Sequence, residues 1–550
     1  MNCLVFEVKS IQAYLFASAR LRDAIGGSEL VDLLTNAQSD SNLLDAVLQA
    51  TKTQGLIEFS RRAGGAFYAF SADAAALERF AALWTLAVQQ WAPGLGFVLG
   101  RGQGANMPEA FAQAQKDARR QNSRERPSYP VAAPVAERAR RTGRVAVDRD
   151  KKDAAFDAAT QRKKAFADLS HAGFITRYSP EEEGLDWRDW PRNLEPDSDA
   201  EEGAFPFVDG RRDLALIHAD GNGMGQVLIR IAAAVRQRPD AFLEIYQTFS
   251  KAIEACTQHA AKQATREVLL PARRNGELLA ARPILLGGDD VIVLVRADLA
   301  MAYVDVFARA FEQKSQEQLA ELAKLKVEGL PDRLTLGFGI AFIGANQPFA
   351  MAAALSESLM AHAKSQAKRR SQGQAITPSS LAFYRVTTAL IDDYDTLVER
   401  VLTHHDGEKR YVHTLGTYAL GSQACGSLPK LADLQALVAR LQAEDMARGP
   451  VRGLLNLLQL DPVQARMSWR RWRQLMSQLM KEKQRSALDD FNDCMRALMP
   501  AYRRDADDLP YAWEEDSGAF VSPLGDALDL LALTPKSTAP SAIQPQEVAA

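Results

Sequence analysis

Residues 282–296 read RPILLGGDDVIVLVR, in which two apolar runs flank the tetrapeptide GGDD. Aliphatic and β-branched runs on both sides of Gly and Asp residues are typical of a β-hairpin. GGDD is also a good turn sequence by itself, because Gly and Asp both favour tight turns. Asp289 and Asp290 nevertheless place two adjacent negative charges at the tip of an otherwise buried hairpin. This makes the pair a candidate for a functional role.

The segments around this hairpin predict an α+β unit. Residues 214–220, LALIHAD, are typical of a buried strand that ends at Asp220, and GNGMGQ then leads into a helical region. A second helical stretch separates the hairpin from another strand, LTLGFGIAFI (334–343), and a helix over 348–370 follows. The order strand, helix, hairpin, helix, strand, helix predicts an antiparallel sheet with helices on one face.

A second copy of this pattern lies near the N-terminus. Residues 95–120 and 336–364 share Leu-Gly-Phe, then Gly-Ala-Asn, then a proline two residues later, then an alanine-rich helix. RRAGGAFYAF (61–70) stands where the hairpin stands, and CLVFEVKSIQAYLF (3–16) stands where the first strand stands. Three matching segments in the same order favour duplication over chance.

The comparison of the two copies points to the carboxylates. In the first copy Ala66 and Phe67 replace the two aspartates, and Lys9 or Ser10 stands near the place of Asp220. We therefore interpret the first copy as lacking all three carboxylates. Because that copy folds without them, the stability of the fold does not require them, and a function explains them better.

The three carboxylates are predicted to bind metal ions. Asp220 ends one strand and Asp289 and Asp290 cap the neighbouring hairpin, so adjacent strands would bring them together. Converging carboxylates repel unless a cation lies between them, and oxygen ligands suit Mg²⁺ or Mn²⁺. Two such ions activate an attacking hydroxyl and neutralise a leaving pyrophosphate. Glycines beside the carboxylates are predicted to let a nucleotide approach the backbone: Gly221, Gly225, Gly287 and Gly288.

The composition is that of a soluble, cytoplasmic protein of several domains. The chain has 550 residues, too many for one ordinary core, and its net charge of −3 excludes a uniformly basic nucleic-acid-binding protein. Its four cysteines are scattered without a CxxC pair, which argues against a zinc ribbon and against a disulfide framework. The N-terminus is unlike a signal peptide, and no uncharged run approaches the length of a membrane span, so no membrane partner is expected.

Three stretches are similar to a known family. FEVKSIQAYLFASARLRDAIGGSELVDLL (6–34), ADGNGMG (219–225) and LLGGDDVIVL (285–294) resemble the large subunit of type III CRISPR effector complexes. The resemblance implies an α+β protein with two ferredoxin-like palm domains, the first degenerate, and a C-terminal helical bundle. We expect a first palm, a charged insertion or linker, a second palm with GGDD, a helical domain and a tail over residues 1–120, 121–210, 211–385, 386–520 and 521–550.

The resemblance also implies an activity and partners. The GGDD palm would make cyclic oligoadenylates from ATP by two-metal catalysis, in a complex with guide RNA, target RNA and other effector subunits that bind the helical domain. Asp220, Asp289 and Asp290 would be catalytic metal ligands, and Ala219 or Gly221 would add a backbone carbonyl. Lys364 and Lys368 would hold the triphosphate; a solvated basic helix face is the alternative. An acceptor ATP would lie in an inter-palm cleft lined by Gly26, Gly27, Ser28, Gly64 and Gly65.

The sequence departs from the family in several places. It begins in the first palm without an HD nuclease domain, has no cysteine cluster for zinc, and carries Asn222 where many members have a second acid. We interpret HHD (404–406) as a polar loop, and SWRRWRQ (468–474) as core packing, with RNA stacking as the alternative. The basic run 119–152 is a solvated linker or an RNA-phosphate contact. Two other functions remain open: a non-catalytic scaffold, and a stand-alone cyclase that makes cyclic dinucleotides.

Overall fold

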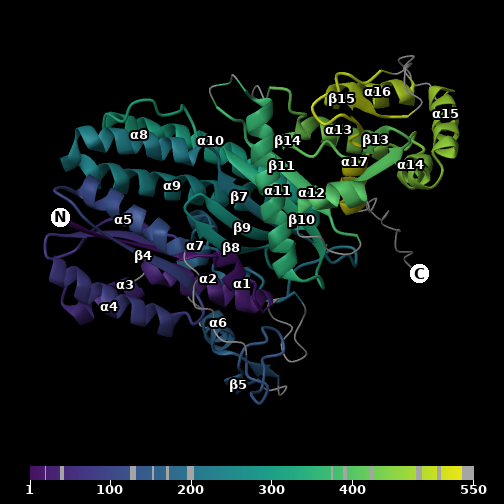
Figure 1. The fold of residues 1–550 in the computed structure, drawn as a ribbon. Helices are drawn as coiled ribbons and strands as arrows, with labels where there is room; N and C mark the ends of the chain where they lie inside the picture. The colour runs from purple at the N-terminus through teal and green to yellow at the C-terminus, as the bar shows by residue number, and fades with distance from the viewer. Residues whose placement is uncertain are drawn as a thin grey trace, which may run out of the picture.

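The computed structural model places two α+β domains against each other, with a third, helix-rich region beyond the second (Figure 1). The description that follows covers residues 1–18, 20–36, 42–123, 132–150, 154–168, 173–194, 204–274, 276–372, 374, 376–387, 393–421, 426–478, 486–503 and 509–534. The basic residues 124–131, the acidic residues 195–203 and the tail from residue 535 therefore lie outside the described residues.

The first α+β domain contains a four-stranded antiparallel sheet with the strand order β2-β3-β1-β4. This order and the connections between its strands are those of a ferredoxin-like fold. Its elements are β1 (Asn2–Lys9), α1 (Ile11–Leu15), α2 (Leu21–Thr35), α3 (Leu43–Thr51), β2 (Glu58–Ala63), β3 (Ala66–Ser71), α4 (Ala74–Trp91), β4 (Gly96–Gln103) and α5 (Met107–Asn122).

The second α+β domain repeats this topology and extends it. Strands β8-β9-β7-β10 lie in the same order as β2-β3-β1-β4, which confirms the repeat predicted from the sequence. Strand β11 then joins β10 in parallel and β14 (Tyr418–Ala419) completes the edge, so the sheet is mixed rather than wholly antiparallel. The other elements are β7 (Asp213–Gly221), α8 (Met224–Gln237), α9 (Phe242–Ala264), β8 (Ala281–Gly287), β9 (Asp290–Arg296), α10 (Ala300–Lys324), β10 (Leu336–Gly344), α11 (Phe349–Arg370) and β11 (Ser380–Arg385).

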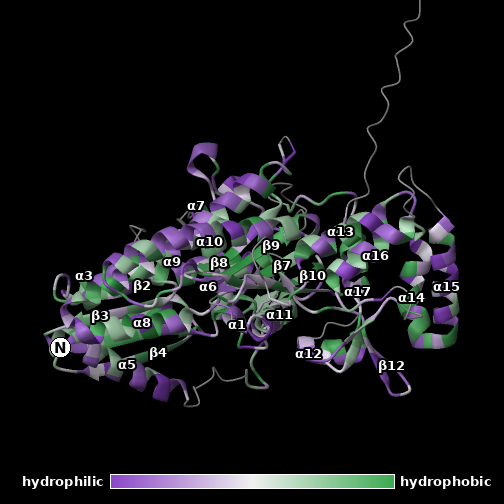
Figure 2. Cartoon of the chain, turned by 90° about the horizontal axis from the view of Figure 1, so that it is seen from above, coloured by the Kyte–Doolittle hydropathy of each residue, from purple (hydrophilic) through white to green (hydrophobic). Residues whose placement is uncertain are grey.

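The prediction that helices cover one face of the second sheet is wrong. Ala215 and Ile217 pack in the core that contains α9 and α10, whereas Leu214 and Leu216 pack in the core that contains α11. Successive strand residues point to opposite faces, so both faces are covered. This explains why the strands read as continuous apolar runs, and Figure 2 shows β7, β8 and β9 as mostly hydrophobic.

The two hairpins correspond in a register that differs by one residue from the sequence comparison. Ala63 pairs with Ala66 across Gly64 and Gly65, and Gly287 pairs with Asp290 across Gly288 and Asp289. The positions of the two aspartates are therefore held by Gly65 and Ala66, not by Ala66 and Phe67. Aligning Gly64-Gly65 with Gly287-Gly288 gave the wrong register. Both Gly64 and Gly65 lie in their turn with positive φ, whereas in the other hairpin only Gly288 does, and Gly287 is still part of the strand.

The first domain also retains a carboxylate in this corner. Glu7 pairs with Ala66, the equivalent of Asp290, whereas Ala219, the residue before Asp220, pairs with Val291. Glu7 is therefore the residue of the first domain that corresponds to Asp220. The sequence comparison had given that position to Lys9 or Ser10. The interpretation that the first copy lacks all three carboxylates is corrected accordingly.

The segment between the two domains is ordered where the structure describes it. It contains β5 (Asp148–Arg149), β6 (Ala155–Phe156), α6 (Ala158–Asp168) and α7 (Gly173–Thr176). Helix α6 packs on α2, and Lys163 of α6 is 1% exposed. Tyr178 is buried and donates a hydrogen bond to the carbonyl of Leu285 at 3.1 Å, so this charged insertion contacts both α+β domains.

The C-terminal region is not purely helical, because it also holds a small sheet of order β12-β13-β16-β15. Residues 404–406 form part of β12 rather than a loop. The rings of Trp469 and Trp472 stack with their centroids 4.5 Å apart, and each residue is 2% exposed. Both therefore pack in the core, as the sequence analysis expected. The elements are α12 (Tyr394–Leu397), β12 (Thr403–Asp406), β13 (Lys409–Val412), α13 (Leu431–Gln442), α14 (Arg448–Leu460), α15 (Pro462–Gln478), α16 (Ala487–Leu498), β15 (Ala512–Glu514), β16 (Ala519–Val521) and α17 (Leu524–Leu533).

Helix α17 lies in the range expected to be a tail, and its apolar face is buried. In the part of the chain that the structure describes, no helix is both long and apolar enough to cross a membrane.

Candidate functional site

The three predicted carboxylates lie at one corner of the second sheet. Asp220 ends β7, and the β8–β9 hairpin carries Asp289 and Asp290 on the neighbouring strand. A Cβ atom on Gly221 would lie 2.8 Å from Oδ2 of Asp289, so the glycine makes room for this carboxylate. Burial, followed by the negative charge of Asp220, raises the pKa of Asp289 to about 6. Burial and the neighbouring carboxylate thus both disfavour the charged form of Asp289.

Lys364 of α11 supplies a positive charge to the other side of the corner. Its ammonium lies 2.5 Å from Oδ2 of Asp220 and 2.8 Å from the carbonyl oxygen of Gly221, to both of which it donates hydrogen bonds. Its side chain passes over Gly337, where a Cβ atom would lie 2.2 Å from Cγ of Lys364. Lys364 thus contacts the Asp220 carboxylate, a partner that the sequence interpretation did not foresee.

Asp290 is turned toward a histidine that the sequence analysis did not single out. Nε2 of His218 lies 2.9 Å from Oδ1 of Asp290, and His218 is 3% exposed. His218 precedes Asp220 by two residues on β7, so both side chains point to the same face of the sheet. That spacing is the only signal in the sequence that could have indicated it.

The first α+β domain also reaches this corner. Gly64 lies at the tip of its hairpin, where a Cβ atom would be 3.4 Å from Cα of Gly287, so the two hairpin tips meet. While burial and Asp220 raise the pKa of Asp289, the positive charge of Arg61 partly offsets them. Gln12 of α1 places its amide nitrogen 3.5 Å from Nδ1 and 3.4 Å from Nε2 of His218.

Gly26, Gly27 and Ser28, which were predicted to line a site for an acceptor nucleotide, are buried within α2. Ser28 is 3% exposed within α2. A Cβ atom on Gly26 would lie 1.8 Å from the carbonyl oxygen of Lys163, and one on Gly27 would lie 3.3 Å from Cε of the same lysine. These glycines let α6 approach α2 closely. The structure therefore gives Gly26 and Gly27 a packing role and leaves Ser28 without an open surface.

A cavity of about 740 Å³ lies on the α8 side of the corner, and Lys364, the partner of Asp220, lines it. Asn222 and Gly223 line it at the N-terminus of α8, a position that favours phosphate. Gly225 follows in the first turn of α8, with open space where its Cβ would be. The basic residues that line the cavity come from α8, from the segment before β10 and from α11, and they include both predicted lysines: Arg230, Arg333, Lys364 and Lys368.

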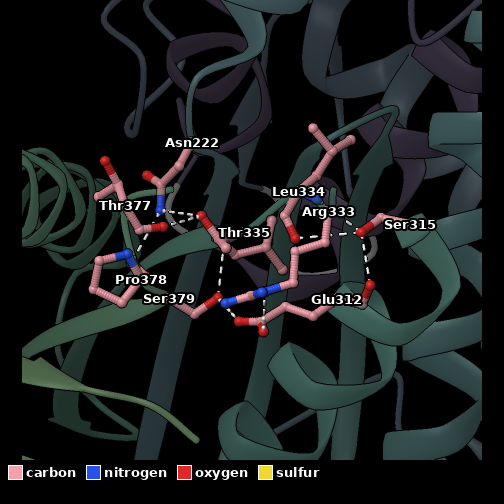
Figure 3. Close-up of polar contacts among 10 residues, drawn as sticks. Asn222, Glu312, Ser315, Arg333, Leu334, Thr335, Thr377, Pro378 and Ser379 are labelled. Carbon is pink, nitrogen blue, oxygen red and sulfur yellow. Dashed lines mark hydrogen bonds and ion pairs between the residues drawn. The ribbon is translucent and has the colours of Figure 1, made fainter. Parts of the chain in front are cut away.

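One wall of this cavity is a chain of polar contacts (Figure 3). The backbone N–H of Asn222 donates to the carbonyl of Thr335 at 2.8 Å, and its side-chain amide donates to the Thr335 hydroxyl at 3.0 Å. That hydroxyl donates to the carbonyl of Thr377 at 2.7 Å. Deeper in the wall, Ser379 donates to Glu312 at 2.6 Å, and burial raises the pKa of this glutamate. Asn222 is thus held in the wall, 8% exposed.

The donor set at the corner fits a divalent cation, although the side chains do not yet converge. Within the described residues, no three His, Cys, Asp or Glu side chains are close enough together to hold a metal ion. Asp290 pairs with His218, and Asp220 pairs with Lys364. The lysine ammonium nevertheless lies between a carboxylate and a carbonyl oxygen, which are ligands that Mg²⁺ and Mn²⁺ prefer. In the part of the chain that the structure describes, Asp289 has no such ion pair, although the positive charge of Arg61 acts on it.

Comparison with known proteins identifies this domain. Residues 213–372 match the family model described as "Cas10/Cmr2, second palm domain". No curated protein matches the chain.

Solved structures similar to the chain include a Csm1–Csm4 cassette in complex with one ATP, at 11% identity and a TM-score of 0.46, covering 97% of this chain and 70% of that one. They also include Csm1 in T. onnurineus, at 13% identity and a TM-score of 0.43, covering 97% and 70%. Because both TM-scores are below 0.5, the assignment rests on the family model. The comparisons therefore show that residues 213–372 are similar to the second palm domain of the Cas10/Cmr2 family.

Proposed function

We propose that the chain makes cyclic oligoadenylates from ATP at the second palm domain, as a subunit of an RNA-guided type III CRISPR effector complex in the cytoplasm. The observation that carries the proposal is the position of the Asp220–Asp289 corner beside a basic cavity of about 740 Å³ within a Cas10/Cmr2 palm. Guide RNA, target RNA and subunits that bind the C-terminal region are part of the same proposal.

The acidic residues would bind metal, and the basic residues would bind the triphosphate. Asp220, Asp289 and the Gly221 carbonyl would hold Mg²⁺ or Mn²⁺, with Asp290 as a further ligand through its second oxygen. Bound metal supplies charge neutralisation and activation of the attacking hydroxyl. The N-terminus of α8 and the basic residues of the cavity would hold the triphosphate: Arg230, Arg333, Lys364 and Lys368.

The reaction is a nucleotidyl transfer. A 3′-hydroxyl oxygen bonds to the α-phosphorus of a second ATP while the bond from that phosphorus to the pyrophosphate oxygen breaks, and the hydroxyl proton leaves to water. The same step, made within one chain, closes the ring. Lys364 pairs with Asp220 and also lines the cavity, so it would contact the triphosphate there if a cation took its place at Asp220.

The test is turnover of ATP by the chain purified with its native partners, in Mn²⁺, with and without target RNA. Mass spectrometry should find cyclic oligoadenylates and equivalent pyrophosphate release. Asp289→Asn should reduce both by at least about a hundredfold, because a neutral amide holds cations poorly. The matched control, Asp240→Asn at an exposed aspartate, should leave turnover unchanged.

Three outcomes separate the alternatives. No pyrophosphate release under either condition, with an intact RNA-containing complex, would leave the scaffold role. Cyclic dinucleotides made without any RNA would identify a stand-alone cyclase. Equal activity in Asp289→Asn and wild type would place the chemistry elsewhere in the chain.

A further inference from the structure

A buried histidine connects the first α+β domain to the carboxylates of the second. His218 lies in β7, where its neighbours Ile217 and Ala219 are buried apolar residues. Its Nε2 atom is 2.9 Å from Oδ1 of Asp290. A polar side chain in such a position needs a partner, and the carboxylate is the partner that it finds.

The contact fixes which oxygen of Asp290 is available. A carboxylate only accepts hydrogen bonds, so His218 must donate through a proton on Nε2. Oδ1 is thereby engaged, and Asp290, whose side chain is 38% exposed, keeps Oδ2 for another ligand. Groups that hydrogen-bond to a metal ligand in this way fix its orientation and raise metal affinity.

The first α+β domain contacts the histidine ring directly. The Gln12 amide nitrogen lies 3.5 Å from Nδ1 and 3.4 Å from Nε2 of His218. The Asp290 carboxylate sets the tautomer, because it needs a proton on Nε2, and the Gln12 amide then has the lone pair of Nδ1 as its acceptor. Gln12 comes from α1, whereas His218 and Asp290 come from β7 and β9.

We infer that His218, supported by Gln12 of the first α+β domain, is a positioning residue that holds Asp290 to receive a divalent cation. The importance of this contact for catalysis rests on the proposed function. The inference itself concerns metal affinity, which is measured without turnover. It gives the first domain a direct part in the site of the second.

The test is Mn²⁺ binding to the full chain without nucleotide, measured by the electron paramagnetic resonance signal of free Mn²⁺. His218→Leu, which keeps bulk but cannot donate, should weaken Mn²⁺ affinity about tenfold, the lower end of what loss of such a supporting group produces. His218→Gln, which carries an amide N–H at a similar reach, should recover affinity to within about threefold of wild type. Gln12→Ala should weaken binding by about threefold, and the exposed control Gln49→Ala should not change it.

The outcomes are decisive in both directions. Wild-type affinity in His218→Leu, or a His218→Gln variant no better than His218→Leu at equal thermal stability, overturns the inference, as does the absence of wild-type binding at millimolar Mn²⁺. If His218→Leu does not fold, the half-buried Gln12 decides, and an unchanged affinity in Gln12→Ala overturns it. Histidine-dependent Mn²⁺ binding without ATP turnover would refute the proposed synthesis alone; turnover with histidine-independent binding would refute this inference alone.

Discussion

Lys364 should have opposite effects on metal and nucleotide binding. Its ammonium occupies the space between Oδ2 of Asp220, at 2.5 Å, and the Gly221 carbonyl, at 2.8 Å. A divalent cation that uses Asp220 must displace it. The same lysine lines the basic cavity, where it is available to phosphate. Lys364→Met should therefore bind Mn²⁺ more tightly in the absence of nucleotide and bind ATP more weakly.

The size of the effect follows from the exposure of the pair. A hydrogen bond to a charged group contributes about 1.5–3 kcal/mol, whereas an exposed ion pair contributes about 0.2–1 kcal/mol. The side chains of Lys364 and Asp220 are 27% and 34% exposed, so the pair lies between these cases, at about 1 kcal/mol. Relief of this competition corresponds to about a fivefold gain in Mn²⁺ affinity. Loss of a charge-assisted phosphate contact should weaken ATP binding by about tenfold or more.

Titration calorimetry with Mn²⁺ and, separately, with a non-hydrolysable ATP analogue measures both quantities. Lys368→Met is the matched control, because Lys368 lines the cavity four residues later on α11. In the described residues it is Lys364, and not Lys368, that pairs with Asp220. The control should lose ATP affinity with no gain for Mn²⁺. A Lys364→Met variant that loses affinity for both ligands, or that changes neither, would refute the reasoning.

Three further predictions concern stability. Burial raises the pKa of Asp526 from 3.8 to about 6, so its contribution to folding is fully present below about pH 4 and is lost as the pH rises through 6. The loss amounts to about 3 kcal/mol at about 1.4 kcal/mol per pH unit, and Asp526→Asn should remove this part of the pH dependence in urea unfolding. Gly26→Ala should lower stability by about 1–3 kcal/mol in thermal melts, because its methyl group would lie 1.8 Å from the Lys163 carbonyl oxygen. Gly27→Ala, whose nearest contact is a side chain at 3.0 Å, should cost less. Asn222→Asp should lower stability by about 1–3 kcal/mol, since a carboxylate cannot donate to the Pro378 carbonyl that the amide contacts at 3.4 Å. An unchanged melting temperature with a gain in Mn²⁺ affinity would show instead that this side chain turns toward the cation.

The sequence predicted what local pattern determines. The hairpin over 282–296 and the strand ending at Asp220 are continuous apolar runs bounded by glycine, and both form where expected. The alignment of the two hairpins failed by one residue, because shared letters do not determine which residues pair across a turn. The contacts of Lys364 with Asp220 and of His218 with Asp290 join residues 144 and 72 positions apart. Such contacts depend on how strands and helices pack. The spacing of His218 and Asp220 places both on one face of β7, but it does not identify Asp290 or Lys364 as their partners.

The first α+β domain is better understood as a support for the site than as a vestige of a second one. Its turn carries Gly65 and Ala66 at the positions of the two aspartates, so it lacks the acidic hairpin tip. The same turn brings Gly64, the equivalent of Gly288, within contact of Gly287. Gln12 and Arg61 then reach residues of the second domain from this contact. Because the first domain lacks an acidic pair of its own, and supplies a contact to His218 and a positive charge near Asp289, its part in the site is to support the carboxylates of its neighbour.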